Sequence, residues 1–64
     1  MDKMETIINS LDTIVEHCTD IKAVLKDGAD IKEFNGSMKS RLVFEMFYIK
    51  FAIQNIEYYL HKGM

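Results

Sequence analysis

The stretch MKSRLVFEMFYIKFAIQNIEYYL, residues 38–60, holds more apolar side chains than one face of one helix can carry. At about 100° per residue on a helix, these side chains fall into two separate stripes. The first stripe is aliphatic and consists of Met38, Leu42, Met46, Ile49, Ile53, Ile56 and Leu60. The second is aromatic and consists of Phe44, Phe47, Tyr48, Phe51 and Tyr58. A two-helix chain can cover only the first stripe, so the second predicts a partner, because large exposed apolar patches mark interaction sites.

Residues 2–27 have the pattern of another amphipathic helix. Their apolar residues alternate steps of three and four, as in a heptad repeat. These residues are Met4, Ile7, Leu11, Ile14, Cys18, Ile21 and Leu25. Ile8 and Val15 widen the stripe to the breadth that a bundle helix needs. Asp2 suits the start of this helix and Gly28 its end.

Gly28 and Gly36 bound a predicted connection, because glycine readily adopts the positive φ angles that interrupt helices. Ile31 and Phe34 lie three residues apart between them and predict a short helical turn. Ser37 then provides an N-cap for the following helix.

These features predict an all-α domain over residues 1–64. It is an antiparallel two-helix hairpin with helices over about 2–27 and 37–62 and a connection over about 28–36. A domain of 64 residues buries only a small core, and its single cysteine excludes an internal disulfide. A second copy is the natural reinforcement, which predicts a dimeric four-helix bundle.

The contact residues are expected on the aromatic side of the second helix, because aromatic side chains bury large areas at interfaces. The residues assigned to the dimer are Phe44, Phe47, Phe51 and Tyr58. Those assigned to contact with another partner are Tyr48, Tyr59 and Arg41. The sequence leaves open whether this side is buried by self-association or is exposed for docking.

No residues have the spacing of a catalytic or metal site. Side chains of the adjacent His17 and Cys18 diverge by about 100° on a helix and cannot easily share a metal. Cys18 falls in the apolar stripe, which predicts a small buried side chain, and His17 is predicted at the surface. Asp12, Glu16 and Asp20 form an acidic line that lacks the Glu-x-x-His motif. We therefore expect no catalytic residue, no cofactor, no metal and no enzyme activity.

The charge pattern limits the partners and the location. A net charge of -2 argues against general attraction to nucleic acid or anionic membranes. The acidic first twenty residues lack the pattern of a targeting segment, so a cytoplasmic location is expected. Glu45, Lys50 and Glu57 interrupt the apolar run, and each costs about 2.5–3.5 kcal/mol at a bilayer centre. No membrane span is predicted.

The leading hypothesis is a small non-enzymatic protein–protein interaction module, a homodimeric regulator or inhibitor that acts by binding another protein. Regulators of this size are often carried by phages and mobile elements. The first alternative is a nucleic-acid-binding dimeric bundle, similar in architecture to a plasmid RNA-binding bundle. In that alternative two copies bring together Lys32, Lys39, Arg41 and Lys50.

The second alternative is a small regulatory phosphatase-like hairpin. Residues 53–57, Ile-Gln-Asn-Ile-Glu, resemble the Ser-Gln-Glu-Leu-Asp motif of the small sporulation phosphorelay phosphatases in the glutamine alone. The serine and the aspartate are absent, so the chain is not assigned to that family. This resemblance implies roles for Gln54, Asn55 and Glu57.

Overall fold

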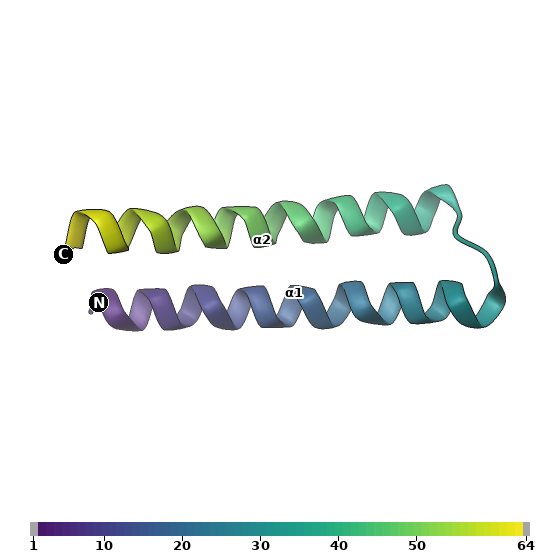
Figure 1. Cartoon of the computed structure of the whole chain (residues 1–64), viewed down its shortest axis with the longest axis horizontal. Coiled ribbons are helices and arrows are strands. Elements are labelled where there is room, and N and C mark those ends of the chain that lie inside the picture. The colour runs from purple at the N-terminus through teal and green to yellow at the C-terminus, as the bar shows by residue number, and fades with distance from the viewer. Residues whose placement is uncertain (1, 64) are drawn as a thin grey trace.

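The chain forms a hairpin of two long antiparallel α-helices, which confirms the predicted all-α hairpin. In a computed structural model, which describes residues 2–63, α1 spans Lys3–Ile31 and α2 spans Gly36–Gly63. Figure 1 shows the helices side by side, with both chain ends at one end of the hairpin and the connection at the other. The molecule is elongated and measures 47 × 15 × 14 Å.

α1 continues past the predicted end at residue 27. Lys32 follows the helix in a left-handed conformation, with φ of 54° and ψ of 39°. Its N–H donates to the Ala29 carbonyl at 3.3 Å, and the Glu33 N–H donates to the Gly28 carbonyl at 3.0 Å. This pair of hydrogen bonds is a Schellman motif. Gly28 therefore lies inside α1, where a Cβ would stand 2.9 Å from the Glu33 carbonyl oxygen.

The connection is short and contains no separate helical turn among the described residues. The turn predicted around Ile31 and Phe34 is wrong because α1 takes Ile31 as its last residue. Phe34 lies against the end of α1, with its Cδ1 atom 3.4 Å from where a Cβ on Gly28 would be. Glycine at this position thus makes room for the chain as it turns back.

α2 begins one residue earlier than predicted, and Asn35 takes the capping role expected of Ser37. The Asn35 Oδ1 atom accepts a hydrogen bond from the Met38 N–H at 2.9 Å. The Asn35 carbonyl accepts a second from the Lys39 N–H at 3.1 Å. An asparagine in this place satisfies one of the N–H groups that a helix start leaves free.

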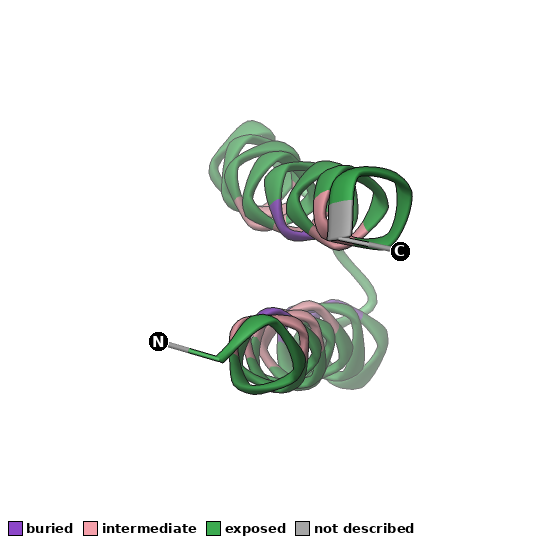
Figure 2. Ribbon diagram, turned by 90° about the vertical axis from the view of Figure 1, so that its left-hand side faces the viewer, coloured by how far each residue is buried: buried purple, intermediate pink, exposed green. Residues whose placement is uncertain are grey.

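The intramolecular interface is narrow. Figure 2 shows the buried and half-buried residues gathered on the sides of the helices that face each other. On α1 these residues are Thr6, Ile7, Ser10, Thr13, Ile14, His17, Asp20, Ile21, Val24 and Gly28. On α2 they are Met38, Leu42, Glu45, Ile49, Ala52, Ile56 and Tyr59. Within the described residues, Val24 and Ala52 are the only buried apolar residues, and they still expose 8% and 5% of their surface.

This interface uses only part of the two predicted aliphatic stripes. Ile7, Ile14 and Ile21 face α2 as expected, but other stripe members are exposed. The exposed members are Met4, Leu11, Cys18, Leu25, Met46, Ile53 and Leu60. The prediction that the stripes cover each other within one hairpin is therefore wrong for these residues. On each helix the interface is centred roughly 50° around the axis from the centre of the stripe. The predictions for Cys18 and His17 are reversed, because Cys18 is exposed and His17 is half-buried.

Candidate interaction surfaces

The exposed stripe members gather on one lateral side of the hairpin. On each helix they follow an interface residue by four positions, as Leu11 follows Ile7 and Ile53 follows Ile49. Such positions lie roughly 70° around the helix from the interface centre, and they fall on the same side of the hairpin because the helices are antiparallel. We call this side the lateral apolar face. Its exposed residues are Met4, Leu11, Cys18 and Leu25 of α1, and Met46, Ile53 and Leu60 of α2; Ile8, Val15 and Val43 border it on the outer sides of the helices.

The opposite lateral side is mostly polar. It is formed by the residues that immediately precede an interface residue on each helix. These are Thr6, Thr13, Asp20 and Asp27 of α1, and Arg41, Tyr48, Asn55 and Lys62 of α2. The two lateral sides of the hairpin therefore differ, although the exposed Phe44 and Phe51 border the polar side along α2.

The predicted aromatic residues lie on the outer side of α2, away from α1. We call this the aromatic surface, and it consists of Phe44, Phe47, Phe51 and Tyr58. All four are exposed, from 52% for Phe51 to 67% for Phe44. The rings of Phe47 and Phe51 pack edge to face with centroids 4.7 Å apart. The structure thus brings these two predicted contact residues together in one exposed cluster.

The three residues predicted to contact another partner do not form one site. The Tyr48 ring stacks on His17 with centroids 5.0 Å apart. Tyr59 is half-buried in the intramolecular interface. Arg41 is exposed and lines a shallow hollow near the connection together with Asp27. Tyr48 and Tyr59 each adjoin the aromatic surface through an edge contact, Tyr48 with Phe47 at 6.3 Å and Tyr59 with Tyr58 at 5.2 Å between ring centroids.

A polar cluster interrupts the intramolecular interface. His17 Nδ1 lies 2.5 Å from Glu45 Oε2, and because an ionised carboxylate can only accept, the ring nitrogen donates. Asp20 lies one turn further along α1, and one ligand atom from each of the three residues falls within 4.8 Å of the others. Sequence spacing did not reveal this cluster, because Glu45 comes from the other helix. The one indication in the sequence was Glu45, a charged residue that falls between the interface residues Leu42 and Ile49 on the same side of α2.

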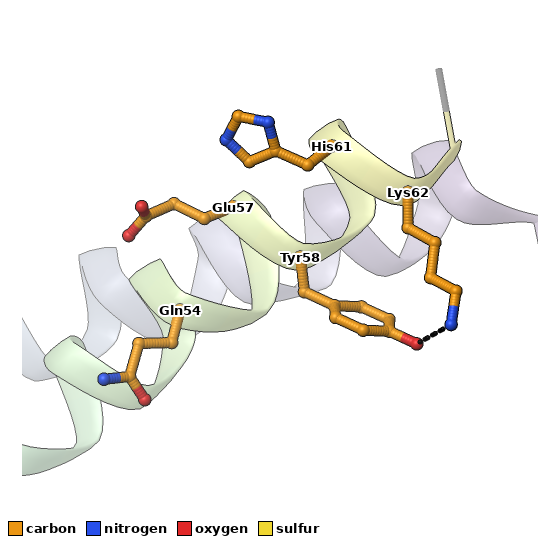
Figure 3. A pocket seen from close by; sticks show the side chains of 5 residues that line it. All are labelled: Gln54, Glu57, Tyr58, His61 and Lys62. Carbon is orange, nitrogen blue, oxygen red and sulfur yellow. Dashed lines mark hydrogen bonds between the residues drawn. The ribbon is translucent and has the colours of Figure 1, made fainter.

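An open depression lies near the carboxyl end of α2 (Figure 3). All of its lining residues belong to that one helix and are exposed: Gln54, Glu57, Tyr58, His61 and Lys62. Lys62 Nζ donates a hydrogen bond to the Tyr58 hydroxyl at 3.1 Å. Figure 3 shows Glu57 and His61 reaching to one side of the helix, and Tyr58 and Lys62 to the other. With no second element opposite them, these side chains do not enclose a substrate.

Together, the fold and these surfaces define a two-helix hairpin with one apolar lateral side and one aromatic outer side. Comparisons with protein-family models, curated proteins and solved structures found no match. Neither of the described helices has a stretch apolar enough to cross a membrane. The surfaces of the molecule therefore carry the functional argument.

Proposed function

We propose that this chain is a non-enzymatic protein–protein interaction module of the cytoplasm, which works as a homodimer and regulates or inhibits another protein by binding it. The observation that carries this proposal is the uncovered lateral apolar face. Leu11 of α1 is 48% exposed, and Met46 and Ile53 of α2 are 59% and 45% exposed. Apolar surface of this extent, contributed by both helices, is characteristic of an interface.

The exposed area of the chain supports self-association. The solvent-accessible surface is 5120 Å². A compact monomer of 7.5 kDa is expected to expose about 4200 Å². The excess is about 900 Å², close to the roughly 800 Å² that each partner buries in an interface of standard size. Pairing two elongated hairpins side by side removes such an excess and enlarges a core in which Val24 and Ala52 are the only buried apolar residues among those described.

The direction of the lateral apolar face fits a four-helix bundle. A helix at the corner of such a bundle contacts two neighbours in directions about 90° apart. On α1 the row of Leu11, Cys18 and Leu25 centres roughly 90° from the intramolecular interface, with Ile8 and Val15 further around on the outer side. The predicted aliphatic stripe then points between the two neighbours, toward the bundle axis. Each stripe is thus shared between the hairpin's own interface and the dimer contact.

The aromatic surface supports the second half of the proposal, the binding of another protein. It lies on the side of α2 away from α1 and apart from most of the lateral apolar face, so a dimer formed through that face leaves Phe47 and Phe51 exposed. Clustered aromatic side chains are the commonest anchors of protein interfaces. We therefore assign the dimer contact to the lateral apolar face and the partner contact to the aromatic surface, which replaces the sequence-based assignment of Phe44, Phe47, Phe51 and Tyr58 to the dimer.

Neither alternative function has an observation in its favour. Lys39 and Lys50 lie on one side of α2, but Arg41 lies about 160° around the helix from Lys39, so one hairpin does not bring the three together as a basic surface for nucleic acid. Gln54 and Asn55 lie about 100° apart on α2, and Gln54 borders only an open depression.

Sedimentation equilibrium of the purified chain tests the dimer. We expect a dimer mass that dissociates on dilution. A mass of one chain at high micromolar concentration contradicts the proposal.

Capture from a lysate of the source organism, followed by reconstitution, tests the partner contact. We expect a captured protein that, once purified, binds the wild type and binds the Phe51→Ala variant at least tenfold more weakly, because a lost interface anchor costs about 2 kcal/mol or more. Gln54→Ala, a change of another exposed residue of α2, serves as the control and should retain binding. Equal binding by the wild type and Phe51→Ala contradicts the assignment of the aromatic surface.

A further inference from the structure

The polar cluster of His17, Asp20 and Glu45 combines three potential metal ligands from both helices. We propose that it binds a divalent transition-metal ion, Zn²⁺ by preference, and that the ion links α1 to α2. This inference does not depend on the proposed function. It rests on the donor set, the distances within the cluster and the environment of each side chain.

The distances suit a metal ion after small side-chain movements. Zn²⁺ bonds to nitrogen and oxygen are about 2.1 Å long, so neighbouring ligand atoms of a tetrahedral site stand about 3.4 Å apart. In the cluster, His17 Nδ1 and Glu45 Oε2 are 2.5 Å apart, and all three donor atoms lie within 4.8 Å of one another. The first separation is shorter than the required value, and the 4.8 Å limit on the others exceeds it. Side-chain rotations that move atoms by about 1 Å therefore complete the arrangement.

The donor set selects the class of ion. One imidazole nitrogen with two carboxylate oxygens suits zinc and other first-row transition metals, whereas magnesium and calcium prefer oxygen ligands alone. In the metal-free pair, the Nδ1–H group of His17 donates a hydrogen bond to the Glu45 carboxylate. When Nδ1 binds the metal, the neutral ring carries its proton on Nε2 instead. Three protein ligands leave a fourth position for water.

The charges of the cluster call for a cation. The side chains of His17 and Glu45 are only 20% and 14% exposed. Asp20 is half-buried, and its carboxylate has no hydrogen-bond or ion-pair partner within residues 2–63. No lysine or arginine in that range forms an ion pair with Glu45. Two carboxylates held this close repel each other in a partly desolvated place, and a bound divalent ion offsets that repulsion.

The site lies toward the polar lateral side of the hairpin, where Asp20 and Tyr48 are found. The lateral apolar face is on the other side, so a second copy docked there leaves the cluster open to solvent. The Tyr48 ring stacked on His17 holds the imidazole plane, with an angle of 9° between the rings. An orienting contact of this kind favours metal affinity because the ligand is already positioned.

Isothermal titration of the full chain with Zn²⁺ tests the site. Cys18→Ser serves as the background, because the exposed Cys18 thiol is itself a zinc ligand. We expect one ion per chain and a thermal unfolding midpoint that rises with free Zn²⁺. Asp20→Asn and Glu45→Gln keep the size of each side chain and remove one charge. Loss of a residue that only supports a metal ligand lowers metal affinity roughly 10- to 100-fold. Loss of a ligand itself should lower the Zn²⁺ affinity by more than this.

His61→Gln is the matched control, since His61 is an exposed histidine outside the cluster and should leave the affinity unchanged. The circular dichroism of each variant shows whether the helices remain formed. If Glu45→Gln lowers helicity, Asp20→Asn, which changes only the edge of the interface, decides the question. The proposal is wrong if the background chain binds no Zn²⁺. It is also wrong if folded Asp20→Asn binds within about threefold of the background, or if His61→Gln abolishes binding.

Discussion

Replacing Val15 with glutamate tests the lateral apolar face at its border with the outer side of α1. Full burial of an aliphatic side chain is worth about 1.5–3 kcal/mol. Val15 has 64% of its surface left to bury, which corresponds to about 1–2 kcal/mol for each copy. Two-fold symmetry doubles this to about 2–4 kcal/mol for the dimer. At about 1.4 kcal/mol for each tenfold change, we expect the dimer dissociation constant to rise roughly 30- to 700-fold. The charge of the buried carboxylate adds to this loss.

Ala23→Glu is the matched control for this variant. It introduces the same charge on the same helix, at an exposed position away from the lateral apolar face. Both new carboxylates have an aspartate three residues before them, Asp12 for position 15 and Asp20 for position 23, so local repulsion on the helix is similar. Sedimentation equilibrium over a wide concentration range measures both constants. If Val15→Glu dimerises within about threefold of the wild type, or no worse than Ala23→Glu, the lateral apolar face is not the dimer contact.

Three further predictions concern the aromatic surface, the cap of α2 and the end of α1. In sedimentation equilibrium, Phe51→Glu should leave the dimer intact and Ile53→Glu should break it, because only Ile53 lies on the lateral apolar face. A dimer that is broken by Phe51→Glu and kept by Ile53→Glu contradicts the assignment. Asn35→Ala should lower the free energy of unfolding by about 1 kcal/mol in urea titrations at fixed protein concentration, and Ser37→Ala by much less, since Asn35 makes the capping hydrogen bond. Gly28→Ala should lower the thermal unfolding midpoint, because its Cβ would stand 2.9 Å from a backbone oxygen. Alanine favours helix over glycine by about 1 kcal/mol, so a raised midpoint would show that the connection shifts to accept the Cβ.

The ends of the helices show where local sequence rules compete. Gly28 has the residue type of a helix end, and Ser37 that of an N-cap. In the structure α1 ends at Ile31 with the left-handed Lys32, and Asn35 caps α2. The end of α1 and the capping residue of α2 both depend on how the connection folds back over the end of α1. The types of the nearby residues do not determine that path.

The polar cluster shows a different limit. Asp20 lies three residues after His17, so sequence spacing places the two on one side of α1. Glu45 is 28 residues from His17 along the chain and reaches it only because the helices pair in this register. Register depends on packing across the whole interface, so a cluster assembled from both helices is invisible to local spacing.

The sequence by itself determined the two helices, their antiparallel pairing and the presence of more apolar surface than one hairpin can bury. The apolar pattern of a helix includes every position that packs against a neighbour, but it does not tell which neighbour covers each position. Only the tertiary structure decided how that surface is divided. The two helices meet along a line roughly 50° from the centre of each stripe, with Ser10, His17 and Glu45 at interface positions and Leu11 and Ile53 outside. A helix can rotate about its axis without changing its sequence pattern, so its rotation is set by the side chains of the neighbour against which it packs.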